Sequence, residues 1–184
     1  MKKTLLLLTM GFALFISSCG SGTEKGANGV TYKSPEDYNN YIINKQTETA
    51  RNLLQFGNSV NTDAKGTLAS LDNYASEIQK DIEDLKGMPA YKGNTELRDA
   101  AVSLFGFYER LFKEDYKKIA EIRAAAPDNN LTEAQAQELN QVAEKLSADE
   151  KGFDNRFQKA QRAFAKEHNM RILENELQKE IDKQ

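Results

Sequence analysis

The sequence predicts an all-α fold, an antiparallel up-down-up-down four-helix bundle with a long or bent C-terminal helix. From residue 34 onward apolar residues recur at spacings of three and four, and no stretch alternates with period two for long. The three prolines all lie at the boundaries of these helical segments. A chain of 184 residues has room for one domain with a substantial core.

The first predicted helix runs from Ser34 to about Val60. Ser34 is a suitable N-cap, and Pro35 occupies the first helical position, where its missing N–H is harmless. The expected inward-facing residues are Tyr38, Ile42, Gln46, Thr49, Leu53, Phe56 and Val60. A turn ending at Asp63 then caps a second helix. Its inward residues are Ala64, Leu68, Leu71, Ala75, Ile78, Ile82 and Leu85, and Gly87 is expected as its C-cap.

A third helix is predicted from Thr95 to the residues before Pro127. Its inward residues are Leu97, Ala101, Leu104, Tyr108, Leu111, Ile119 and Ile122. The fourth begins with a capping box of Thr132 and Gln135. A second capping-box pattern at Ser147 leaves open a break there, and a change in the direction of the apolar stripe leaves open a bend near His168. Short turns between long helices predict antiparallel neighbours.

The C-terminal segment carries a separate apolar stripe of Met170, Leu173, Leu177 and Ile181. At helical spacing these residues line one side of a short helix. Two interpretations stay open. The segment folds back on its own bundle, or it presents a surface to a protein partner or to a second copy of the chain.

Three polar residues interrupt the predicted core stripes, namely Gln46, Thr49 and Asp115. In the expected topology they lie at similar depth in the bundle, so they could form one polar layer. Such a layer either fixes the register of the helices or lines a pocket for a small ligand. A buried carboxylate would need hydrogen bonds or hydration in either case.

The N-terminus has the pattern of a secretory signal. Lys2 and Lys3 are followed by an apolar run from Leu5 to Ile16, which is too short to cross a membrane permanently. The residues Ile16-Ser17-Ser18-Cys19 then resemble the lipobox of bacterial lipoproteins. The resemblance covers residues 1–19 and implies acylation (palmitate or a similar chain) of Cys19 and cleavage before it. The alternative is an ordinary signal peptide that ends beside a cysteine.

The expected organisation is a signal peptide at residues 1–18, a lipidated Cys19 with a flexible Gly-rich tether at 19–33, and a bundle domain at 34–184. Two or three acyl chains make a stable membrane anchor, whereas one binds reversibly. In Gram-negative lipoproteins an Asp after the cysteine favours the inner membrane. Gly20 therefore indicates the outer membrane of the cell envelope, and the periplasmic side is expected rather than the cell surface.

The segment Asp37 to Thr47, which follows a lipobox and a short linker, resembles the first helix of an uncharacterised surface-lipoprotein family of Bacteroidetes and spirochaetes. The match covers about a tenth of the chain. It implies a tethered helical domain and supplies no functional residues.

Composition argues against several kinds of chemistry. The net charge is −3, or −5 once Lys2 and Lys3 are removed with the signal, and no basic cluster suggests nucleic acid. Cys19 is the only cysteine and His168 the only histidine; the latter is expected to be solvated. No catalytic residue, metal ligand or cofactor is predicted. The expected function is a membrane-tethered, non-catalytic interaction or structural module. The alternatives are a small-ligand-binding protein and, last, a carboxylate-based enzyme.

Overall fold

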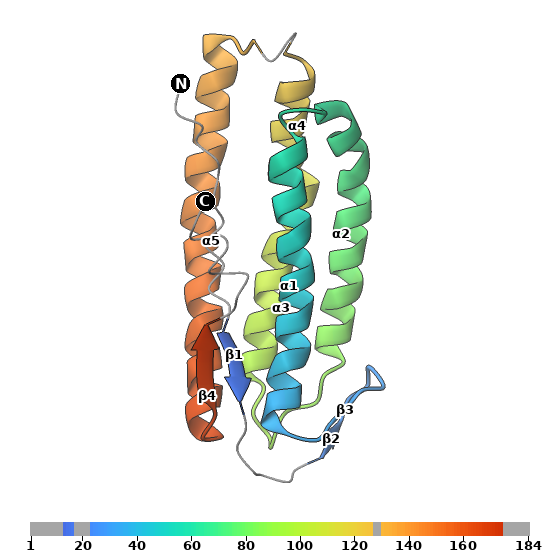
Figure 1. Cartoon of the computed structure of the whole chain (residues 1–184), viewed down its shortest axis with the longest axis vertical. Helices are drawn as coiled ribbons and strands as arrows, with labels where there is room; N and C mark the ends of the chain where they lie inside the picture. The colour runs from blue at the N-terminus through green and yellow to red at the C-terminus, as the bar shows by residue number, and fades with distance from the viewer. Residues whose placement is uncertain (1–12, 17–22, 127–129, 175–184) are drawn as a thin grey trace.

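The computed structural model describes residues 13–16, 23–126 and 130–174, and within them the chain forms the predicted antiparallel helical bundle (Figure 1). Its long helices are α1 (Pro35–Ser59), α2 (Ala64–Lys86) and α5 (Glu133–Glu167). The remaining member of the bundle is a continuous helical segment of three parts: α3 (Glu96–Arg110), the π-helical turn η1 (Leu111–Asp115) and α4 (Tyr116–Ala124). The fold class is confirmed.

Three of the helices begin where the sequence predicts, because each has a side chain that caps it. Ser34 Oγ accepts a hydrogen bond from Asp37 N at 3.1 Å, and Asp63 accepts one from Gly66 N at 2.9 Å. Thr132 forms the complete capping box with Gln135. These bonds satisfy N–H groups that the first turn of a helix leaves free.

The predicted third helix is a continuous helical segment that contains a π turn in its middle. In η1 the wider turn inserts an extra residue, which shifts the helix face that follows it. Leu111, Phe112 and Asp115 are all buried there. The ring of Tyr116, directly after the π turn, stacks on Phe56 of α1 at a centroid distance of 4.0 Å.

The segment predicted as a flexible tether is folded over its last part, which corrects that prediction. β2 (Glu24–Lys25) and β3 (Thr31–Tyr32) form a hairpin, and Tyr32 is 1% exposed. The Asn28 amide donates to Tyr32 Oη at 2.8 Å and to the Asp84 carbonyl of α2 at 3.0 Å. The folded domain therefore begins near Glu24 rather than at residue 34; residues 19–22 lie outside the described part.

Gly87 does cap α2, but its φ of −75° is ordinary, so left-handed geometry does not explain the glycine. A Cβ on Gly87 would lie 2.8 Å from Asn28 N, in the hairpin. The glycine is thus needed for the close approach of the hairpin to the end of α2.

The C-terminal part differs from the predicted helix. α5 passes through Ser147 without a break and ends at Glu167. Asn169 then takes a φ of 54°, and Met170 N bonds back to the Ala165 carbonyl at 2.8 Å. The chain continues as a strand, β4 (Arg171–Glu174). The expectation of a helical stripe is therefore wrong for this stretch, because the left-handed residue ends the helix.

The strand β4 pairs antiparallel with β1 (Ala13–Ile16), from the predicted signal segment. β1 also packs against α1, and β4 packs against α5. By contrast, the backbones of α1 and α5 hardly approach each other, whereas α3 packs closely along both α2 and α5. The strand pair therefore fills the side of the bundle between α1 and α5, level with the first half of α1 (Figure 1).

None of the helices in the described part of the chain is both long enough and apolar enough to cross a membrane.

Candidate functional site

The side of α1 that faces away from α2 is buried along a second stripe. On the α2 side, Lys45 forms ion pairs with Asp81 at 2.5 Å and Asp84 at 2.9 Å. Three other α1 residues each follow a residue of the predicted inward stripe and so lie about 100° further round the helix. They are Asn39, Ile43 and Ala50, each at most 2% exposed. The helix is thus buried over a wider arc than one stripe provides, and β1 packs against it.

One polar contact joins α1 directly to α5. Gln161 Nε2 donates to Asn39 Oδ1 at 3.0 Å, and both side chains are at most 2% exposed. Within the described residues, the other end of the Asn39 amide, Nδ2, is buried without a partner. The neighbouring Asn40 likewise has a buried, unpartnered Oδ1. This side of α1 therefore holds one unused donor and one unused acceptor.

Gln46 and Thr49 are buried as predicted, each 2% exposed. The Gln46 side chain lies close enough to the Tyr108 hydroxyl on α3 to influence its pKa. Gln46 Oε1 and Thr49 Oγ1 have no partner among the described residues. Burial raises the pKa of Tyr108 well above its usual value, and the charges of Asp154 and Glu150 raise it further, so this hydroxyl stays protonated.

Glu150 of α5 is 8% exposed, and within the described part of the chain its Oε1 makes no hydrogen bond. Burial, followed by the negative charge of Asp154, raises the pKa of the Glu150 carboxyl to about 8. Burial also raises the pKa of Asp154 to about 6, although Gln158 donates to that carboxylate at 2.7 Å. At neutral pH, therefore, the Glu150 side chain is mostly a neutral acid.

Asp115 is buried too, but in a different polar cluster. Its Oδ1 accepts from Lys145 Nζ of α5 at 2.9 Å, and its Oδ2 lies 3.6 Å from an Arg110 nitrogen. Arg110 also binds Asp149 at 2.7 Å. No hydrogen bond or ion pair within the described residues joins Asp115 to Gln46 or Thr49.

Tyr116 lies close to both groups of polar residues. Burial raises its pKa, and the negative charges of Glu150 and Asp115 add to the effect. The three residues predicted to form one polar layer therefore lie in two groups. Gln46 and Thr49 lie on the α1 side near Tyr108, and Asp115 belongs to an ion cluster that links α3 and η1 to α5.

The other predicted residues are placed as follows. Met170 is 9% exposed and anchors the start of β4, and Leu173 is paired in that strand with Leu14. Leu177, Ile181 and Cys19 lie outside the described residues. His168 is not solvated as expected, since it packs edge-on to Phe164 at 4.5 Å and Tyr91 at 5.1 Å. Burial lowers its pKa.

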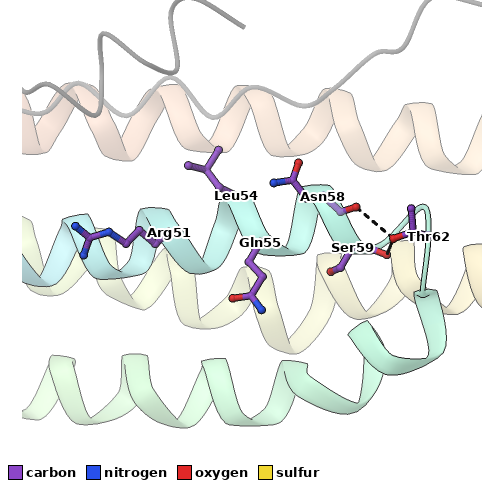
Figure 2. Close-up of a pocket in the computed structure, with 6 residues that line it drawn as sticks. All are labelled: Arg51, Leu54, Gln55, Asn58, Ser59 and Thr62. Atoms are coloured by element: carbon purple, nitrogen blue, oxygen red, sulfur yellow. Dashed lines mark hydrogen bonds between the residues drawn. The ribbon is translucent and has the colours of Figure 1, made fainter.

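A shallow depression lies elsewhere, along the second half of α1 and the turn after it (Figure 2). Its lining is Arg51, Leu54, Gln55, Asn58, Ser59 and Thr62. Most of these side chains are exposed, and the depression is wide open to solvent. It lacks the enclosed, apolar character of a small-molecule site.

The chemical groups between α1 and α5 are of four kinds. They are aliphatic side chains, amides, hydroxyls and a protonated carboxyl. Within the described residues, no group of three or more histidine, cysteine, aspartate or glutamate side chains is placed to hold a metal ion.

The sequence did not reveal Asn39, Glu150 or Gln161 as part of this side. None of the three lies on a predicted core stripe, and amide and carboxylate side chains are usually exposed. The one usable signal was the doubled apolar pair Ile42-Ile43, which widens the buried face of the helix by one residue.

No family model, curated protein or solved structure matches this chain. The interpretation of this side therefore rests on its own residues.

Proposed function

We propose that this protein is a lipoprotein, held at the outer membrane by acyl chains on Cys19, whose helical domain is a non-catalytic binding module. The binding surface is the side of the bundle between α1 and α5. The periplasmic side of the membrane is the proposed location.

The observation that carries this proposal is the position of β1. This strand belongs to residues 1–18, which the lipobox resemblance marks for removal. It lies against α1 and pairs with β4, on the side where α1 and α5 hardly approach each other. Cleavage before Cys19 would remove β1 from the face of α1 against which it packs. We expect this to uncover Ile43 and the unpartnered amide atoms of Asn39 and Asn40, because they are buried on the side of α1 that faces away from α2. An exposed apolar patch with unpaired polar groups at its side is typical of a surface that binds another protein.

The tether is tested by metabolic labelling with palmitate in the native host. The wild-type protein should carry label and partition into detergent, and Cys19→Ser should do neither. Absence of lipid on the wild-type protein would refute the anchor and, with it, the processing on which the binding surface depends.

Exposure of the surface is tested with a single reporter thiol. Ile43→Cys should react rapidly with a maleimide in the processed, lipidated protein, where Cys19 is itself blocked by acylation. The same reporter in a Cys19→Ser background, which retains residues 1–18, should be protected. Ile78→Cys is the matched control, because Ile78 is equally buried (1% exposed) but lies on α2. Protection of Ile43→Cys in both forms would contradict the proposal.

A second candidate function is binding of a small polar ligand by the groups near Tyr108. It is favoured by the buried, unpartnered atoms Gln46 Oε1, Thr49 Oγ1 and Glu150 Oε1. Unpaired polar atoms in a protein interior are costly, and a bound polar molecule would satisfy them.

Native mass spectrometry of the purified protein distinguishes the two candidates. A small molecule that co-purifies with the wild type and is lost in Thr49→Val, while circular dichroism stays helical, would favour the second. Glu144→Gln, an exposed change on α5, serves as the control. A spectrum with no bound molecule in either protein would leave the protein-binding module as the better proposal.

A further inference from the structure

β1 lies between two elements, β4 and α1, which hold it by different kinds of contact. We call these two elements the walls around β1. One wall is the edge of β4, to which all four residues of β1 pair in antiparallel register, from Ala13 with Glu174 to Ile16 with Arg171. The other wall is α1, against which β1 packs. A segment in this position is therefore held by main-chain hydrogen bonds on one side and by packing on a helix on the other.

The edge of β4 is positioned by α5 and does not depend on β1 for its start. Met170 is buried, and its N–H bonds to the Ala165 carbonyl at 2.8 Å. His168 N bonds to the Phe164 carbonyl at 3.1 Å, and Asn169 turns the chain in the left-handed conformation. When β1 is removed, the strand edge that it covered would present unpaired N–H and C=O groups, which is the usual template for pairing with another strand.

We infer that the place left by β1 takes an extended apolar segment of a partner protein, which adds to β4 as an antiparallel strand. This inference rests on the proposed function, because the place becomes vacant only if residues 1–18 are cleaved. It adds the class of partner and the mode of binding.

The chemistry of the α1 wall matches such a segment. Ile43 supplies apolar surface, and the sequence of the segment now bound there, Ala-Leu-Phe-Ile, is apolar throughout. In the described part of α1, Asn39 Nδ2 and Asn40 Oδ1 are a donor and an acceptor without partners. β1 leaves both atoms without partners. The edge of β4, by contrast, needs main-chain N–H and C=O groups, which an extended peptide offers and an acyl chain does not. Strand addition of this kind obtains affinity from the main chain and specificity from alternate side chains.

The test uses the mature lipoprotein, purified from membranes in detergent, and a synthetic fluorescent peptide. The peptide carries the sequence of residues 12–17 between solubilising lysines, and binding is followed by fluorescence anisotropy. Saturable binding is expected. A peptide with proline in place of both Leu14 and Phe15 should bind about tenfold more weakly. Alternate residues of a strand bond to the same neighbour, so one of these two supplies an N–H to the ladder, and proline has none.

The uncleaved Cys19→Ser precursor is the matched control, since its own β1 fills the place. It should bind the peptide about tenfold more weakly than the mature protein, as expected when a strand edge is already paired. Equal binding of the proline peptide, or equal binding by the precursor, would overturn the inference, because either result means adsorption of an apolar peptide without strand addition.

The thiol experiment separates the two possible failures. If Ile43→Cys reacts in the mature protein but the peptide does not bind, the surface is open and only the strand-addition inference fails. If Ile43→Cys stays protected in the mature protein, the proposed binding surface itself fails.

Discussion

Gln161 of α5 donates a 3.0 Å hydrogen bond to Asn39 of α1, although 122 positions separate the two residues in the chain. This buried amide pair joins the two helices whose backbones otherwise hardly approach each other. On the side of the bundle between α1 and α5, two features therefore connect the helices. They are the Asn39–Gln161 hydrogen bond and the strand pair β1–β4.

Replacing Asn39 with leucine should lower the free energy of unfolding by about 1–3 kcal/mol, because the buried Gln161 amide loses a hydrogen-bond acceptor. Urea denaturation followed by circular dichroism measures the change. Adding Gln161→Leu should recover part of the loss, since the polar group that lost its acceptor is then removed as well. Asn52→Leu, which breaks a 3.2 Å contact to Glu77 at the surface, is the control and should have a much smaller effect. A double variant no more stable than Asn39→Leu alone would argue against this account.

The raised pKa of Glu150 predicts a dependence of stability on pH. The carboxyl has a pKa of about 8 in the folded protein, against an ordinary glutamate pKa of 4.5. Between these values the folded state binds the proton more tightly than the unfolded state, so this group makes stability fall as the pH rises from 4.5 to 8. Glu150→Gln should therefore gain stability relative to wild type over this range, by a few kcal/mol and at most about 5.

Urea denaturation at several pH values tests the Glu150 prediction. Glu144→Gln removes the same charge from an exposed position of α5 and should follow the wild-type pH profile. If Glu150→Gln also keeps the wild-type profile, the carboxyl is ionised in the folded protein and the assignment is wrong.

Asp115→Leu should change the free energy of unfolding by less than about 1 kcal/mol, because a buried ion pair is often replaced by an apolar residue at little cost. Arg110 keeps its 2.7 Å contact with Asp149, and Lys145 is 51% exposed, so neither cation is left buried alone. Thermal unfolding measures the change. A loss of several kcal/mol would mean that Asp115 holds α5 against η1 more strongly than the geometry suggests.

Gly87→Ala tests whether the hairpin is docked. The added Cβ would lie 2.8 Å from Asn28 N, so it should displace the hairpin and destabilise the protein by about 1–3 kcal/mol. Gly152→Ala is the control, because a Cβ there has nothing within 4 Å, and it should stabilise α5 by about 0.5–1 kcal/mol. Limited proteolysis at Lys25 should accelerate only in Gly87→Ala. Rapid cleavage of the wild type at the same bond would support a free tether instead.

The sequence by itself determined the helices and their order. Ser34, Asp63 and Thr132 cap helices through bonds to residues only three positions away. Such contacts form wherever the local sequence allows them, so they can be inferred without the rest of the molecule. The apolar spacing likewise determined which faces are buried, including Gln46, Thr49 and Asp115.

Only the tertiary structure decided what those faces meet. The Gly-rich segment around Asn28 looks like a flexible linker in the sequence. It is nevertheless folded, because Asn28 bonds to the carbonyl of Asp84, which lies 56 residues away in the chain. Arg171–Glu174 runs antiparallel to Ala13–Ile16, from the opposite end of the chain. Glu150 has a raised pKa because of its buried position and the charge of Asp154. In each case a residue's state depends on groups brought near by packing, and neither residue type nor local spacing carries that information.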